Sequence, residues 1–189
     1  MDKRVRALGA VALFGVLAAG GNEAEVYAGR ELGADEGLVV IRIERVSSES
    51  ASDSASTNPI AQVLTAVLRE VDGKRRATLP DSDKAVAIVL PAGRWYVDEL
   101  RTLRERNLPR VMQKFQNFEV QAGKINYAGV YKVRFLIGTG GSMSAQTAIE
   151  YDPPLIEEAT RAFPDAFTKW PLVYCPLSRT CKPPAEFRH

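Results

Sequence analysis

Residues 118–135, which read FEVQAGKINYAGVYKVRF, contain the most regular pattern of the chain. Over residues 130–135 the side chains alternate, so that one set faces each side of the backbone. The first set is Val130, Lys132 and Arg134, and the second is Tyr131, Val133 and Phe135. This period of two is typical of a strand with one wetter face. Ala122-Gly123-Lys124 turns the chain between residues 118–120 and the strand that follows.

Three further runs predict strands. Residues 38–46 alternate in the same way, and residues 85–90 form a short apolar run that is typical of a buried strand. Residues 94–97 begin another run directly after Pro91-Ala92-Gly93. Because these three residues favour a turn, the sequence predicts a hairpin between residues 85–90 and 94–97.

Residues 60–71 fit two structures. Their apolar residues have the spacing of a helix stripe, with Asn58-Pro59 as a start signal. However, Asp72-Gly73 follows, and a second run then covers residues 74–79. Asp-Gly between two such runs is a hairpin signal, so we favour a strand over residues 64–71.

A helix is predicted after Asp152, which has the residue type of an N-cap. Charged residues match the helix dipole, with Glu157 and Glu158 expected in the first turn and Arg161 in the last. Pro164 is expected to end the helix. The apolar face consists of Leu155, Ile156, Ala159, Ala162 and Phe163.

Together these elements predict a mainly β protein, an antiparallel β-sandwich of about six or seven strands with one C-terminal helix. The sandwich domain is expected over residues 37–165, after an exposed and flexible leader at 22–36. Residues 47–58 and 138–144 are expected to be loops, because they are rich in small polar residues and glycine. A Pro-rich, irregular tail covers residues 166–189, and its aromatic residues are expected to pack onto the domain.

The N-terminus predicts a secretion signal over residues 1–21. Positive residues precede an apolar run from Ala7 to Ala19, which is short for a permanent membrane anchor or a transmembrane helix. A signal peptidase could cut within Ala18–Gly21, and Val26-Tyr27-Ala28 is a second candidate. An uncleaved anchor or a buried helix is the alternative. The positive residues are Lys3, Arg4 and Arg6.

The 189 residues include 25 Lys+Arg and 23 Asp+Glu, for a formal charge of +2. Without residues 1–21, which hold three bases and one acid, the chain has 22 basic and 22 acidic residues. A balanced chain argues against a general nucleic-acid binder, which needs basic residues in excess to displace counterions. The charge is unevenly distributed, however, because the net charge is −5 over residues 22–70 and +5 over residues 71–189.

The chain has two cysteines, Cys175 and Cys181, and one histidine, His189. In an oxidising compartment the short spacing favours a disulfide, although a metal pair or a redox dithiol stays an alternative. A lone histidine at the last position argues against Ser–His–Asp and Cys–His catalysis and against a zinc site with several histidines. No cofactor is expected.

A set of turn and strand residues resembles a known group of domains. The set is Pro91, Gly93, Tyr96, Phe118, Val120, Ala122, Gly123, Lys124, Tyr127 and Gly129. Their spacing is similar to that of uncharacterised bacterial envelope domains, many of them lipoproteins, with a prealbumin-like, carboxypeptidase-regulatory type of β-sandwich. The resemblance covers about residues 37–165 and implies no catalytic residue. This chain lacks the cysteine that carries the lipid, with Gly20 or Gly21 in its place.

A basic surface over residues 94–114 is the main candidate for partner binding. It has six bases and three acids, and its alternative is a solvated loop whose charges keep the protein soluble. The bases are Arg94, Arg101, Arg104, Arg106, Arg110 and Lys114. The adjacent acids Asp98-Glu99 and Glu157-Glu158 are not expected to act as a catalytic pair, because strand neighbours point to opposite faces.

These features predict a protein of the bacterial periplasm that binds or scaffolds another envelope component without catalysis. The expected partner is an envelope protein or an anionic component of the cell wall or lipid. An immunity-type inhibitor of a toxin is the alternative, followed by a hydrolase that acts on the cell wall.

Overall fold

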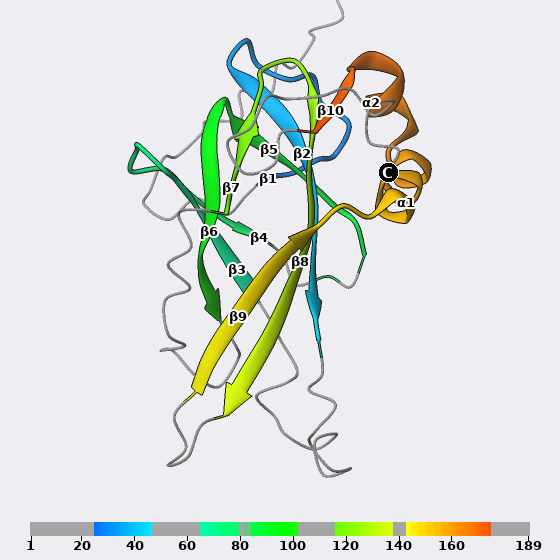
Figure 1. The fold of residues 1–189 in the computed structure, drawn as a ribbon. Helices are drawn as coiled ribbons and strands as arrows, with labels where there is room; N and C mark the ends of the chain where they lie inside the picture. Colours follow the sequence, from blue (N-terminus) through cyan, green and yellow to red (C-terminus); the bar gives the residue numbers. More distant parts are fainter. Residues whose placement is uncertain are drawn as a thin grey trace, which may run out of the picture.

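The computed structural model describes residues 25–46, 65–79, 82, 84–101, 116–137 and 143–174. These residues form ten strands and two helices, in two β-sheets with both helices beside one of them (Figure 1). The strands are β1 (Glu25–Val26), β2 (Glu36–Arg45), β3 (Thr65–Glu70), β4 (Arg76–Leu79), β5 (Val86–Pro91), β6 (Gly93–Arg101), β7 (Asn117–Val120), β8 (Ile125–Ile137), β9 (Met143–Glu150) and β10 (Leu172–Tyr174). The helices are α1 (Pro153–Ala162) and α2 (Pro164–Lys169).

The larger sheet has six strands, in the order β1-β5-β2-β8-β10 with β9 also paired to β8. Strands β2 and β8 are parallel, although the sequence predicted antiparallel pairing. Strand β10 pairs in parallel with residues 125–127 of β8, and β9 pairs with residues 130–137. The two shorter strands therefore share one edge of the long strand β8.

The smaller sheet is antiparallel, in the order β4-β3-β6-β7. Its first two strands form the hairpin that Asp72-Gly73 predicted, and residues 65–70 are a strand rather than a helix. The preference for a strand over residues 64–71 is thus confirmed for the residues that the structure describes.

The predicted hairpin between residues 85–90 and 94–97 is wrong. Strand β5 belongs to the larger sheet and β6 to the smaller one, so the two do not pair. Both edges of β5 are already taken by β1 and β2, and both edges of β6 by β3 and β7. Pro91-Ala92-Gly93 instead carries the chain from one sheet to the other, with Gly93 at φ +146° and the Ala92 N–H donating to the Asp35 carbonyl at 2.7 Å.

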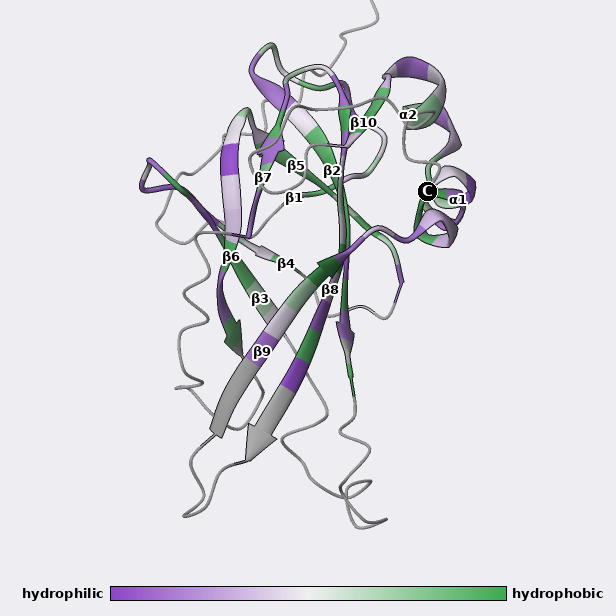
Figure 2. Ribbon diagram, viewed as in Figure 1, coloured by the Kyte–Doolittle hydropathy of each residue, from purple (hydrophilic) through white to green (hydrophobic). Residues whose placement is uncertain are grey.

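The main hydrophobic core lies between the two sheets. It takes buried side chains from both, and it includes Ile88 and Tyr131 from the larger sheet and Leu68, Trp95 and Phe118 from the smaller one. Figure 2 shows hydrophobic residues (green) along β2, β5 and β3, and hydrophilic residues (purple) in the β3–β4 turn. The predicted strand patterns are therefore confirmed for β2 to β8, which turn apolar side chains toward the opposite sheet.

A second core lies between the outer face of the larger sheet and the helices. Leu38, Val40 and Val130 from the sheet contact Leu155 and Ala159 of α1 in this cluster. Near the start of residues 130–135, side chains on both faces of β8 are therefore buried, because α1 covers Val130. Farther along the strand Lys132 is half-buried and Arg134 exposed, as a wetter face requires.

Both ends of the described chain are more ordered than predicted. The exposed leader expected at 22–36 is wrong for Tyr27, which is 7% exposed. Glu25–Val26 pairs with β5 as a strand, although Val26 itself is 49% exposed. At the other end the tail contains α2 and β10. Its Trp170 packs on Tyr27 and its Tyr174 on Tyr127, so these two aromatic residues contact the domain as expected.

The helix begins and ends near its predicted residues, with two differences. Glu157 and Glu158 lie one turn later than expected, because Pro153 and Pro154 occupy the start of the first turn. Pro164 does follow the end of α1, but it also opens α2 at a position where its missing N–H costs nothing. Within the part of the chain that the structure describes, no helix has the length and apolar character needed to cross a membrane.

Candidate functional site

The outer face of the smaller sheet carries a polar row across all four strands. In the pairing register Arg76 of β4 lies opposite Arg69 of β3, Arg69 lies opposite Tyr96 of β6, and Tyr96 lies opposite Asn117 of β7. Residues paired directly across strands share one face, with Cβ atoms about 5 Å apart. Arg94 lies two residues before Tyr96 on β6 and so shares this face. We call this surface the arginine face.

A β-bulge in β6 places two carboxylates on the arginine face. Val67 pairs with Glu99 while Leu68 pairs with Val97, which leaves Asp98 as the extra residue. The expectation that Asp98 and Glu99 point to opposite faces is therefore wrong. Asp98 contacts Arg69 and Glu99 contacts Arg76, and the bulge is the physical reason.

Asp98 is the most buried charged residue of this face, at 2% exposure. Its Oδ2 lies 3.4 Å from an Arg69 guanidinium nitrogen, and the Tyr96 hydroxyl donates to its Oδ1 at 3.4 Å. Both distances are long for hydrogen bonds, so the pairing offsets only part of the cost of burying the carboxylate. Burial, followed by the Asp98 charge, raises the pKa of the Tyr96 hydroxyl, which therefore stays protonated as a donor.

Glu99 and Asp72 hold the other two arginines of this face. The Glu99 carboxylate lies 3.8 Å from Arg76, and the Asp72 carboxylate pairs with Arg94. Each arginine therefore has a carboxylate neighbour, while its side chain stays between a third and a half exposed.

The predicted basic surface is described only in part. Arg94 lies on the arginine face, and the backbone of Arg101 pairs with Thr65 at the end of β6. The remaining predicted residues lie outside the described part of the chain, and so do both cysteines of the predicted disulfide. These are Arg104, Arg106, Arg110, Lys114, Cys175 and Cys181.

The arginine face carries acids beside its arginines. Its three arginines are matched by Asp72, Asp98 and Glu99, and Glu119 lies opposite Arg94 in the register. Among the described residues, each arginine of this face thus has an acid beside it.

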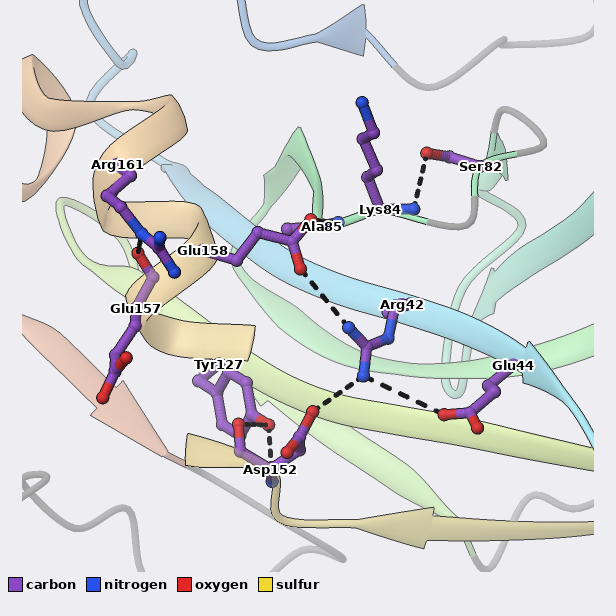
Figure 3. Close-up of polar contacts among 10 residues, drawn as sticks. All are labelled: Arg42, Glu44, Ser82, Lys84, Ala85, Tyr127, Asp152, Glu157, Glu158 and Arg161. Carbon is purple, nitrogen blue, oxygen red and sulfur yellow. Dashed lines mark hydrogen bonds and ion pairs between the residues drawn. The ribbon is translucent and has the colours of Figure 1, made fainter. Parts of the chain in front are cut away.

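A second polar cluster lies on the other side of the molecule, where α1 meets the larger sheet (Figure 3). Arg42 of β2 contacts Asp152 at 2.7 Å, Glu158 at 3.3 Å and Glu44 at 3.9 Å. The second oxygen of Glu158 accepts the Ala85 N–H at 2.9 Å. One arginine therefore ties together a strand, a helix and the segment that leads into β5.

Tyr127 completes this second cluster. Its hydroxyl donates to the Asp152 carbonyl at 3.0 Å and accepts the Asp152 N–H at 2.9 Å. Burial raises the pKa of this hydroxyl well above its usual range. Asp152 holds the N-cap position as predicted, but its carboxylate binds Arg42 instead of capping the helix.

Neither pair of adjacent acids forms two facing carboxylates with a free path between them. In Figure 3 the Glu157 side chain points away from Glu158, which turns toward Arg42 and Ala85. Asp98 and Glu99 share a face, but each lies beside an arginine. In the described ranges, histidine, cysteine and acidic side chains do not gather in groups that could hold a metal ion.

Sequence reasoning missed Arg42, Arg69 and Arg76 as members of clusters. Each is one polar residue in an alternating or ambiguous run, and its partners lie far away along the chain. A bulge and the packing of a helix on a sheet decide which charges meet, and neither can be read from local periodicity.

A search with family models found no match for this chain, and no curated protein matched it either.

Proposed function

We propose that this protein is a secreted, non-catalytic binding module of the bacterial envelope, with a prealbumin-like β-sandwich, and that it binds another protein through the arginine face. Two sheets with a shared core support the sandwich. Export to the periplasm is supported by the basic and apolar pattern of residues 1–21.

The observation that carries the binding role is the state of the three arginines. The side chains of Arg69, Arg76 and Arg94 are 32%, 40% and 46% exposed, and each has a carboxylate neighbour. A guanidinium has five N–H donors in a fixed plane, so one neighbouring acid orients it without using all of them. The remaining donors suit the carboxylates and carbonyls of a partner surface.

The charge balance favours a protein partner over a lipid surface or a wall polyanion. Attraction to an anionic membrane or polymer needs a cluster of unbalanced bases. On the arginine face each of the three arginines has an acid partner among the described ion pairs. A protein surface with interleaved charges matches such a pattern, since complementary pairs set its register and exclude wrong partners.

The state of the acids supports a role without catalysis. A hydrolase of the two-carboxylate type needs both carboxyl groups to face one substrate across a cleft. Asp98 and Glu99 lie beside different arginines, and Glu158 binds Arg42 and a backbone N–H. These contacts explain the acids as anchors for arginines and for the helix.

Mild crosslinking of the exported protein in its own envelope, followed by affinity capture and mass spectrometry, tests this proposal. We expect one stoichiometric protein partner with the wild type and its loss in the double variant Arg69→Ala/Arg76→Ala. Arg161→Ala is the matched control, because this exposed arginine lies on α1 and donates only to a carbonyl of its own helix among the described contacts.

Equal capture by the double variant and the control would refute the arginine face as the binding site. A toxin as the single partner would identify the narrower immunity-type role. Lipid or glycan in place of a protein would refute the choice of partner, and turnover of a wall fragment that is lost on Asp98→Asn would refute the absence of catalysis.

A further inference from the structure

The sequence offers two positions at which a signal peptidase could cut, within Ala18–Gly21 or after Ala28. The two cuts give mature chains that differ by residues 21 or 22 to 28. The fold distinguishes them, because residues 25–27 are part of the described domain. The inference that follows depends on the export proposed above.

Residues 25–27 are bonded to the larger sheet. Glu25 pairs with Val89 and Val26 with Ile88, so β1 covers part of the outer edge of β5. The Tyr27 N–H donates to the Ala87 carbonyl at 2.9 Å and continues the same edge. A chain that began at Gly29 would leave this edge of β5 without its partner.

The Tyr27 ring also fills the core beneath the helices. It is 7% exposed and packs edge-on against Phe163 at 6.1 Å and Trp170 at 5.9 Å, measured between ring centroids. Phe163 joins α1 to α2, and Trp170 follows α2. Removal of Tyr27 would therefore leave a cavity at the point where both helices rest on the sheet, and large cavities are among the costliest changes in a core.

We infer that the signal peptidase cuts before Gly21 or Asn22, and that Val26-Tyr27-Ala28 is not a processing site. The cut hydrolyses one peptide bond with one water, leaving a carboxylate on the released leader and an amino group on the mature chain. Ala18 with Gly20, or Ala19 with Gly21, supplies the two small residues that such a site requires. Both cuts keep β1 and Tyr27 in the mature protein.

N-terminal sequencing and the intact mass of the protein isolated from the envelope test this inference. We expect the mature chain to begin at Gly21 or Asn22. A chain that begins at Gly29 would overturn the inference while leaving the proposed export intact. A chain that retains Met1 would overturn the inference together with the cleaved signal on which it rests, and these results are separated by mass alone.

Thermal unfolding of the exported protein tests the structural reason independently. Tyr27→Ala should lower the melting temperature by roughly 10 °C, because it opens the cavity beside Phe163 and Trp170. Val26→Ala is the matched control, since Val26 is 49% exposed, and it should melt close to the wild type. Equal melting of the two variants would overturn the reason for placing the cut upstream of β1.

Discussion

The outer faces of the two sheets both carry arginines, but the arginines differ in their exposure and in the number of carboxylates around them. On the larger sheet, Arg42 is 20% exposed and lies among three carboxylates beneath a helix. On the smaller sheet, Arg69, Arg76 and Arg94 are more exposed, and each has a carboxylate neighbour among the described residues. An arginine whose donors are used within the chain stabilises the fold, whereas one that is only oriented can still bind something else.

The helices explain why the two faces differ. Both pack over the outer face of the larger sheet, where Leu155 and Ala159 are fully buried (Figure 1). The acids of α1 and its N-cap therefore come within reach of Arg42. The acids of the arginine face come from the strands and turn of its own sheet, so they lie beside the arginines instead of covering them.

The largest expected effect is that of Arg42→Ala. Three carboxylates would lose their shared cation, and the links from the helix to β2 would be lost with it. We expect the free energy of unfolding to fall by about 2 kcal/mol, less than for a fully buried pair because the carboxylates stay partly exposed. Urea denaturation measures this change. Arg94→Ala, with its more exposed ion pair, should change stability far less, and equal losses would remove the distinction between the faces.

Tyr127→Phe tests the second tie between the helix start and the sheet. This change keeps the ring in the core but removes both hydrogen bonds to the Asp152 backbone. The Asp152 N–H would lose its partner and the Asp152 carbonyl would keep only the Leu155 N–H, so we expect a loss of about 1–2 kcal/mol. Tyr27→Phe is the control, because the buried Tyr27 hydroxyl has no hydrogen-bond partner in the described structure. If Tyr127→Phe is as stable as the control, the hydroxyl does not fix the start of α1.

Local patterns were enough to predict most strands of both sheets but not how the strands assemble. Residues 38–46, 85–90 and 130–135 are strands because their side chains alternate or form a buried run. The change of sheet at Pro91–Gly93 was missed, because a turn has the same residues whether its strands pair or cross between sheets. Strand β9 was missed as well, since its small polar residues have little hydrophobic period.

The candidate site was predictable only where it depends on sequence neighbours. Arg94 was found because it begins a basic stretch, but its charge balance depends on Asp72, from a different hairpin. The bulge at Asp98 reverses the expected direction of an acid, and nothing in the run from Arg94 to Arg101 indicates it. The short strands β1 and β10 were missed because two or three residues are too few to show a period, and both pair along the edge of a longer strand.

Acid should weaken the smaller sheet through Glu70, at the end of β3. Its hydrogen bonds to Arg75 lower the pKa of this carboxyl below its ordinary value of 4.5. A lowered folded-state pKa gives stability that is present above the unfolded value and is lost as the pH falls through the folded value. We expect this contribution to be below about 1 kcal/mol, since the Arg75 side chain is 42% exposed.

The variant that tests this pH effect is Glu70→Gln. Its midpoint of urea denaturation is compared with that of the wild type from neutral pH to about pH 3. The variant should be slightly less stable than the wild type at neutral pH, and the difference should shrink as the pH falls below 4.5. Glu157→Gln is the control, because Glu157 is an exposed residue of α1. A difference that stays constant with pH would show that Glu70 acts through packing and not through its charge.

The smallest expected change in stability is that of Asp98→Leu, and it is the sharpest test of the comparison. Removing one partner of a buried ion pair is costly when the other charge stays buried, but Arg69 is exposed enough to be solvated alone. The Tyr96 hydrogen bond that is lost as well is a long one, at 3.4 Å. We expect the free energy of unfolding to stay within about 1 kcal/mol of the wild type, while capture of the envelope partner falls because Arg69 loses its orienting acid. Asp98→Asn, which keeps a hydrogen-bond acceptor for Arg69 and Tyr96, should retain part of the capture. If Asp98→Leu instead unfolds the protein and leaves capture by the folded fraction unchanged, Asp98 is a structural anchor like Asp152, and the arginine face does not differ from the face beneath the helices.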